Sequence, residues 1–151
     1  MDGLQIKKQL VDLVIERLKR KLDLLNRGKN QAQADANEHV GAMESRYDTF
    51  KEEAQTLVNG FAMQIQKTLN VLASIQQLSL KISSVIEIGS VILTDGGAFF
   101  VSTGLIEEPL EVEGTKYECV NLGAPIVQKI KSAKNAEAEI GGRKIKVLEV
   151  F

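Results

Sequence analysis

The chain has no tryptophan, one cysteine, one histidine and two prolines in 151 residues. The single cysteine, Cys119, excludes an internal disulfide and is typical of a protein in a reducing compartment. The single histidine, His39, argues against a metal site built from several imidazoles. Aromatic residues make up only 5% of the chain, which suits the thin packing of a coiled coil.

An excess of charge of one sign and long hydrophobic runs are also missing. The formal net charge is -1, so the chain lacks the positive charge of a general nucleic-acid binder, and we expect no sequence-specific DNA binding. No stretch approaches the ~20 apolar residues of a transmembrane helix. The first residues, 1–4, lack the cationic and then apolar pattern of a signal peptide. We therefore expect a cytoplasmic protein with no membrane partner.

Two segments, 4–30 and 45–78, carry apolar residues at heptad spacing, and no proline interrupts residues 4–80. This pattern predicts an antiparallel coiled-coil hairpin over residues 1–80, with an acidic tip near 31–44. The first helix places Leu4, Val11, Leu18 and Leu25 in one row, widened by Val14, Ile15 and Leu22. The second places Tyr47, Ala54, Phe61, Thr68 and Ile75 in one row, and Phe50, Leu57, Ile65 and Leu72 in the next.

Short β-branched runs separated by glycines follow in residues 81–151. The pairs Gly96-Gly97 and Gly141-Gly142 predict hairpin turns, and Pro125 predicts the start of one helix over 125–131. We expect a small antiparallel β domain with one helix, which makes the fold class α+β. The expected strands are 90–94, 98–102, 117–120, 136–140 and 143–150.

Three local features of this second part are also interpreted from the pattern. The acidic stretch 107–114 is expected to be a loop or a hairpin tip. Phe100 alternates with Phe99, so we expect Phe99 in the core and Phe100 exposed as a docking residue. Cys119 lies in a strand pattern and is expected to be a buried small apolar residue.

The order of these segments resembles the GreA/GreB family of bacterial transcript cleavage factors, which act in transcription elongation. The resemblance covers nearly the whole chain, and it implies an FKBP-like C-terminal domain. It is carried by Val85-Ile-Glu-Ile-Gly-Ser-Val91, by Asn121-Leu-Gly-Ala-Pro-Ile-Val-Gln-Lys-Ile130, by the terminal Ile145-Lys-Val-Leu-Glu-Val150 and by Asp35-x-x-Glu38. The chain departs from the family pattern at Ala124, at 132–134 and at 39–42.

The resemblance implies a protein that binds RNA polymerase, inserts its hairpin into the secondary channel and stimulates cleavage of backtracked RNA. Asp35 and Glu38 would be the catalytic pair, which recruits Mg²⁺ shared with the polymerase and binds none stably alone. Glu44 and Asp48 are backups for this role. The chain would not itself be an enzyme, because the nuclease activity belongs to the polymerase.

Simpler interpretations of these residues stay open. Asp35 and Glu38 are equally explained as solvated charges, and Asp35 as a helix cap. Glu44 and Asp48 are common residue types in a first helical turn. Arg27, Lys29 and Arg46 are candidate contacts to the 3′ end of the nascent RNA or to the channel wall. The alternative is a solvated basic helix face. His39 is a candidate tip contact or an exposed loop residue.

Two further functions fit the same sequence. One is a Gre-fold regulator that binds the polymerase without cleavage activity. The other is a coiled-coil interaction or scaffold protein, which predicts an exposed apolar seam and a stable oligomer.

Overall fold

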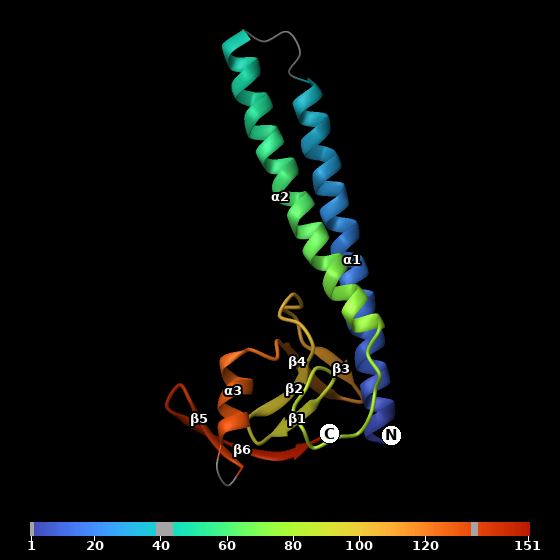
Figure 1. The fold of residues 1–151 in the computed structure, drawn as a ribbon, viewed down its shortest axis with the longest axis vertical. Helices are drawn as coiled ribbons and strands as arrows, with labels where there is room; N and C mark the ends of the chain where they lie inside the picture. The colour runs from blue at the N-terminus through green and yellow to red at the C-terminus, as the bar shows by residue number, and fades with distance from the viewer. Residues whose placement is uncertain (1, 39–43, 134–135) are drawn as a thin grey trace. The chain divides into compact units, whose positions relative to one another are not determined.

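The structure is a computed structural model that describes residues 2–38, 44–133 and 136–151, although the side chains of 36, 38 and 44–48 lie outside the description. It has the predicted α+β class, with two long helices followed by a six-stranded sheet and one short helix (Figure 1). The elements in chain order are α1 (Gly3–Glu38), α2 (Glu44–Gln76), β1 (Val91–Thr94), β2 (Gly97–Val101), β3 (Leu110–Val112), β4 (Thr115–Val120), α3 (Pro125–Ser132), β5 (Glu137–Ile140) and β6 (Arg143–Val150).

The chain divides into two compact units, and α1 contributes to both. One unit contains residues 1–17 and 74–151, and the other contains residues 18–73. The domain boundary predicted at residue 80 lies inside the first of these units. No helix in the described part of the chain is long and apolar enough to cross a bilayer.

The unit of residues 18–73 is an antiparallel pair of helices, in which α1 and α2 lie side by side (Figure 1). Leu18, Leu25 and Ala32 are buried at seven-residue intervals, so the predicted seam of the first helix is confirmed and continues beyond residue 30. The buried residues of α2 in this unit include Val58 and Leu72. The apolar faces of the two helices therefore cover each other within one chain.

Part of the predicted second row in α2 is wrong. Phe50 and Leu57 are 40% and 53% exposed. The predicted row stepped eight residues from Leu57 to Ile65, which rotates it away from a single face of a helix with about 3.6 residues per turn. Val58, one residue later, takes the inward position instead.

The sheet has the strand order β3-β4-β2-β1-β6-β5 and is antiparallel except for one pair. β2 and β4 run parallel, with Phe100 opposite Cys119, and this pair departs from the predicted all-antiparallel arrangement. The stretch 107–114, predicted to be a loop or a hairpin tip, contains β3 and the tip of the hairpin that β3 forms with β4. Glu113 and Gly114 both have positive φ, as a two-residue turn of this twist requires.

One face of the sheet packs against α3. Ile92, Phe99 and Val101 form a buried cluster there with Val127 and Ile130 of the helix. The core position predicted for Phe99 is therefore confirmed. Proline near the start of α3 fits the first turn, where a backbone N–H has no helical partner.

The opposite face of the sheet is also covered, and this makes the prediction of an exposed Phe100 wrong. Phe100 is 0% exposed, as are Val91 and Leu110 on the same face. Leu10 and Val14 of α1 are equally buried in the same compact unit. Alternation along a strand separates two faces, but it does not say which of them meets solvent.

The C-terminal hairpin of β5 and β6 has the predicted turn. Ile140 pairs with Arg143, and Gly141 and Gly142 both adopt positive φ between them. Ala136 was expected in the strand, but it is exposed with φ of 57° and precedes β5. Its carbonyl accepts a 2.7 Å hydrogen bond from the Val147 N–H, so it still joins β6.

Candidate functional site

Asp35 lies in the last turn of α1, and its carboxylate is exposed. Its Oδ1 accepts a 2.8 Å hydrogen bond from Nε2 of Gln31, one helical turn earlier. Residues four apart share a helix face, so this bond holds the carboxylate along the helix surface. Asp35 follows Ala32 by three residues, and Ala32 is the last buried residue among the described side chains of α1. Asp35 therefore presents a negative charge to solvent just past the apolar seam.

Glu38 is the final residue of α1, three residues after Asp35. Positions three apart on a helix are neighbours on its surface, so residues 35 and 38 share one side of the backbone of α1. The side chain of Glu38 lies outside the described part, as do those of Glu44, Arg46 and Asp48. His39 also lies outside the described residues. Part of the predicted tip is thus helical, because α1 runs to residue 38 and α2 begins at Glu44.

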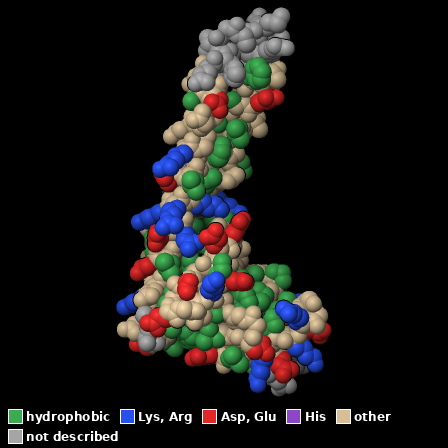
Figure 2. Space-filling model, turned by 180° about the vertical axis from the view of Figure 1, so that it is seen from behind, with side chains coloured by type: hydrophobic (Ala, Val, Ile, Leu, Met, Phe, Trp, Pro, Cys, Tyr) green, Lys and Arg blue, Asp and Glu red, His purple; other side chains and the backbone are tan. Residues whose placement is uncertain are grey.

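Basic residues follow α1 towards this end. The Arg27 guanidinium forms a 3.0 Å ion pair with Asp23, and both side chains are mostly exposed. An exposed pair of this kind contributes only about 0–1 kcal/mol, so Arg27 can exchange Asp23 for a phosphate at little cost. Lys29 is half-buried. Figure 2 shows blue basic side chains gathered along the surface of the helices.

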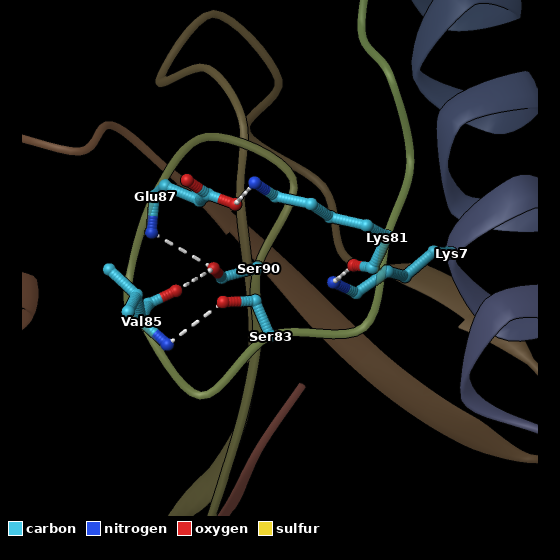
Figure 3. Close-up of polar contacts among 6 residues, drawn as sticks. All are labelled: Lys7, Lys81, Ser83, Val85, Glu87 and Ser90. Atoms are coloured by element: carbon cyan, nitrogen blue, oxygen red, sulfur yellow. Dashed lines mark hydrogen bonds and ion pairs between the residues drawn. The ribbon is translucent and has the colours of Figure 1, made fainter.

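A second polar cluster, not anticipated from the sequence, surrounds Lys7 near the start of α1 (Figure 3). Lys7 is only 3% exposed, and its Nζ donates a 2.7 Å hydrogen bond to the Lys81 carbonyl. The amine also lies 5.9 Å from the centre of the Phe151 ring. Burial lowers the pKa of Lys7, and the nearby Glu87 carboxylate partly opposes that shift. The signal was present in the sequence, since Lys7 stands seven residues before the apolar Val14.

The segment that receives Lys7 is held by its own short-range bonds (Figure 3). The Ser90 hydroxyl accepts from the Glu87 N–H at 2.9 Å and donates to the Val85 carbonyl at 3.2 Å. Nζ of Lys81 lies 3.7 Å from the Glu87 carboxylate. These bonds satisfy backbone groups in a connection that has no helix or strand. The cluster is therefore structural, joining α1 to the chain that enters β1.

Cys119 is half-buried rather than buried as predicted. Burial raises the pKa of its thiol, while a hydrogen bond with Ser102 and the charge of Arg17 lower it. A thiol that stays protonated is a poor nucleophile. The arrangement fits a packing role rather than catalysis.

In the described ranges, no three His, Cys, Asp or Glu side chains gather as a possible metal-binding group. Asp35 therefore belongs to no such group among the described side chains. Comparison with known protein families, curated proteins and solved structures found no match for this chain.

Proposed function

We propose that this chain is a Gre-type accessory factor of RNA polymerase that stimulates cleavage of backtracked RNA. The observation that carries the proposal is the exposed Asp35 carboxylate in the last turn of a long helix, just past the buried seam. A paired helix of this length is a means of bringing one acidic group into a narrow channel. The residue resemblance to the GreA/GreB family adds the identity of the partner.

The donor set fits magnesium held jointly with another protein. Mg²⁺ prefers oxygen ligands, keeps several waters and is often bound by only one or two carboxylates of a given chain. Asp35 and Glu38 are of this type and stand on the same turn of α1. When bound, the ion lowers the pKa of a coordinated water and stabilises a leaving oxygen. The residues of this chain contribute the carboxylates and their position, and Gln31 holds the Asp35 carboxylate along the helix.

The basic residues are assigned to positioning the RNA. Arg27 has only an exposed ion pair to give up. Contacts from Arg or Lys to phosphate orient a nucleic acid without reading its sequence. This role agrees with a chain whose overall charge is near neutral.

The scaffold alternative predicts an apolar seam left open for a second chain. Leu18, Leu25 and Val58 are instead buried within one chain, which favours a hairpin that is closed by itself. The non-cleaving regulator needs the same fold and the same partner. Only the chemistry at Asp35 and Glu38 separates it from the proposed function.

The test is RNA cleavage in a halted, backtracked complex of the cognate RNA polymerase with Mg²⁺. The variants are Asp35→Asn, Glu38→Gln and the double variant. Asn keeps an oxygen for the bond from Gln31 but loses the charge that a magnesium ligand supplies, so we expect cleavage to fall well below the parental rate. Glu52→Gln, an exposed carboxylate on α2, is the matched control and should keep the parental rate.

Binding to the polymerase is measured in parallel with all five proteins, which are the parent, the three tip variants and the control. Cleavage by the parent and the control but not by the Asp35 variant supports the proposal. If the parent binds and leaves the RNA intact, the non-cleaving regulator replaces the cleavage factor. If the parent does not bind, the proposal is abandoned.

A further inference from the structure

The two helices of the hairpin each contain one interior glycine, and these glycines have different surroundings. A Cβ added at Gly28 of α1 would lie 2.7 Å from both Cε1 and Cζ of the Phe61 ring of α2. A Cβ added at Gly60 of α2 would meet nothing within 4 Å. Gly28 therefore makes room for an aromatic ring, whereas Gly60 makes room for nothing.

The Gly28 position belongs to the seam. It follows the buried Leu25 by three residues and precedes the buried Ala32 by four, so all three share one helix face. A glycine inside a helix is unfavourable relative to alanine. The Phe61 ring occupies the volume that a side chain at residue 28 would need. The ring of Phe61 thus packs into the space that glycine leaves at residue 28, and any larger residue there would require the ring to shift.

We propose that the contact between Gly28 and Phe61 fixes the register of the hairpin, and thereby positions Asp35. Asp35 lies seven residues after Gly28, and Ala54 lies seven residues before Phe61. The helices are antiparallel and rise equally, by about 1.5 Å per residue, so Asp35 stands at the level of Ala54. The bearing on RNA cleavage rests on the proposed function, whereas the register does not.

Two other buried residues of the seam, Ala32 and Thr68, select the register weakly. Ala32 is small and fits many partners. The Thr68 hydroxyl is buried, but it donates its 2.8 Å bond to the Gln64 carbonyl of its own helix. A slip of one helical turn would keep the apolar faces together. The ring of Phe61 is the feature that such a slip would force against a residue with a Cβ.

The register is read by disulfide cross-linking in the full chain, with Cys119→Ser to remove the native thiol. Ala32 lies four residues after Gly28 and Val58 three before Phe61, so both are buried in the same layer. Ala32→Cys with Val58→Cys is expected to cross-link on oxidation. Pairing Ala32→Cys with Ala54→Cys or with Ala62→Cys reports a slip of one turn in either direction.

Gly28→Ala is then added to each pair, and Gly60→Ala serves as the matched control. Gly60→Ala is expected to keep the Ala32–Val58 cross-link and to raise Tm by about 2–4 °C, because it improves helix propensity in open space. Gly28→Ala is expected to lower Tm and to shift or lose that cross-link. Adding Phe61→Leu to Gly28→Ala removes the overlap and should recover part of both.

The proposal is overturned if Gly28→Ala keeps the Ala32–Val58 cross-link in full and raises Tm as Gly60→Ala does. The ring would then simply move aside. These readouts need no polymerase, so they stand even if the cleavage assay is negative. Where the parent does cleave, Gly28→Ala should reduce cleavage with Asp35 intact, and Phe61→Leu should restore part of it.

Discussion

Lys7 is the buried charged side chain among the residues that the structure describes, with 3% of its surface exposed. Its amine has left solvent for one carbonyl, one aromatic face and the field of Glu87. An isolated ammonium loses much hydration in such a place, and this disfavours its charged form. Lys7 nevertheless joins α1 to the segment before β1 by a bond that an apolar residue could not make. Lys7 thus loses hydration of its amine, and in return its hydrogen bond connects two segments that are far apart in the sequence.

The lowered pKa of Lys7 leads to a prediction on pH. In the unfolded chain the amine keeps its ordinary pKa of 10.5, so between the folded pKa and that value the unfolded state binds more protons. The contribution of Lys7 to the free energy of unfolding should therefore rise with pH through this window, which lies below 10.5. Urea unfolding of the parent and of Lys7→Met at a series of pH values measures it.

Lys7→Met removes the titrating group. The free energy of unfolding of the parent should therefore rise relative to that of the variant as pH rises. A constant difference across the window would show that the folded environment does not disfavour the charge. Tyr117, whose pKa is raised by burial, titrates in both proteins, and its contribution cancels in the comparison.

At the scale of elements, the sheet is a layer with two covered faces. α3 covers the side of Phe99, and the buried Phe100 lies on the other side. Sequence alternation normally assigns one strand face to solvent. In this chain, the residues on the sheet face opposite α3 are also apolar, and the start of α1, up to Arg17, belongs to the same compact unit. Two adjacent strand residues that are both apolar, such as Phe99 and Phe100, therefore indicate that both faces of the sheet are covered.

This view predicts the effect of truncating Phe100. Phe100→Ala should cost about 3–5 kcal/mol of unfolding free energy, since a buried aromatic ring leaves a cavity and loses its contacts. Leu148→Ala in β6 should change it by no more than about 0.5 kcal/mol, since Leu148 is 62% exposed. Urea unfolding curves give both values. A small loss of unfolding free energy in Phe100→Ala would contradict the burial of Phe100 and favour the exposed docking residue predicted from the sequence.

At the same scale, the residues that sequence patterns placed correctly are those whose partners are local. The helices, the turn at Gly141-Gly142 and the start of α3 follow from heptads, glycine pairs and proline. β3 and the parallel pairing of β2 with β4 were missed. Their partners lie up to about twenty residues apart along the chain, and a three-residue strand has too short a pattern to recognise.

At the scale of the whole molecule, the two compact units differ in how much they bury. In the described part of residues 18–73, the buried side chains are Leu18, Leu25, Ala32, Val58, Thr68 and Leu72. The other unit has a sheet with apolar residues buried on both faces. Regions with few buried apolar contacts open at a lower free energy than the core of a domain. We therefore expect the two compact units to differ in the free energy at which they unfold.

We predict that the helical hairpin loses its structure at lower urea than the sheet. Far-UV circular dichroism reports mainly the two long helices, α1 and α2. The chain has no tryptophan and two tyrosines, so in a Tyr47→Phe variant the fluorescence comes from Tyr117 alone, which is buried on β4. The dichroism midpoint should precede the fluorescence midpoint. Coincident transitions would instead indicate a single cooperative unit.

One part of the candidate site was predicted from the sequence, and the other part was found only in the structure. The residue types at the helix end, Asp35 and Glu38, were found from the sequence, because an acidic pair beyond an apolar seam is a local pattern. That Asp35 is in a helix, bonded to Gln31, appeared only in the structure. Heptad spacing could not say where the first helix ends, since polar good helix formers such as Gln and Glu continue a helix without apolar support.

The sequence by itself determined the α+β class, the helical seam, the hairpin turns and the acidic residues near the helix end, because each depends on neighbours within a few turns. The tertiary structure decided which faces are buried, that Phe100 is covered, that Lys7 is enclosed and that Phe61 occupies the space at Gly28. These depend on groups far apart in the chain that meet only when the elements pack, and no local pattern records that meeting.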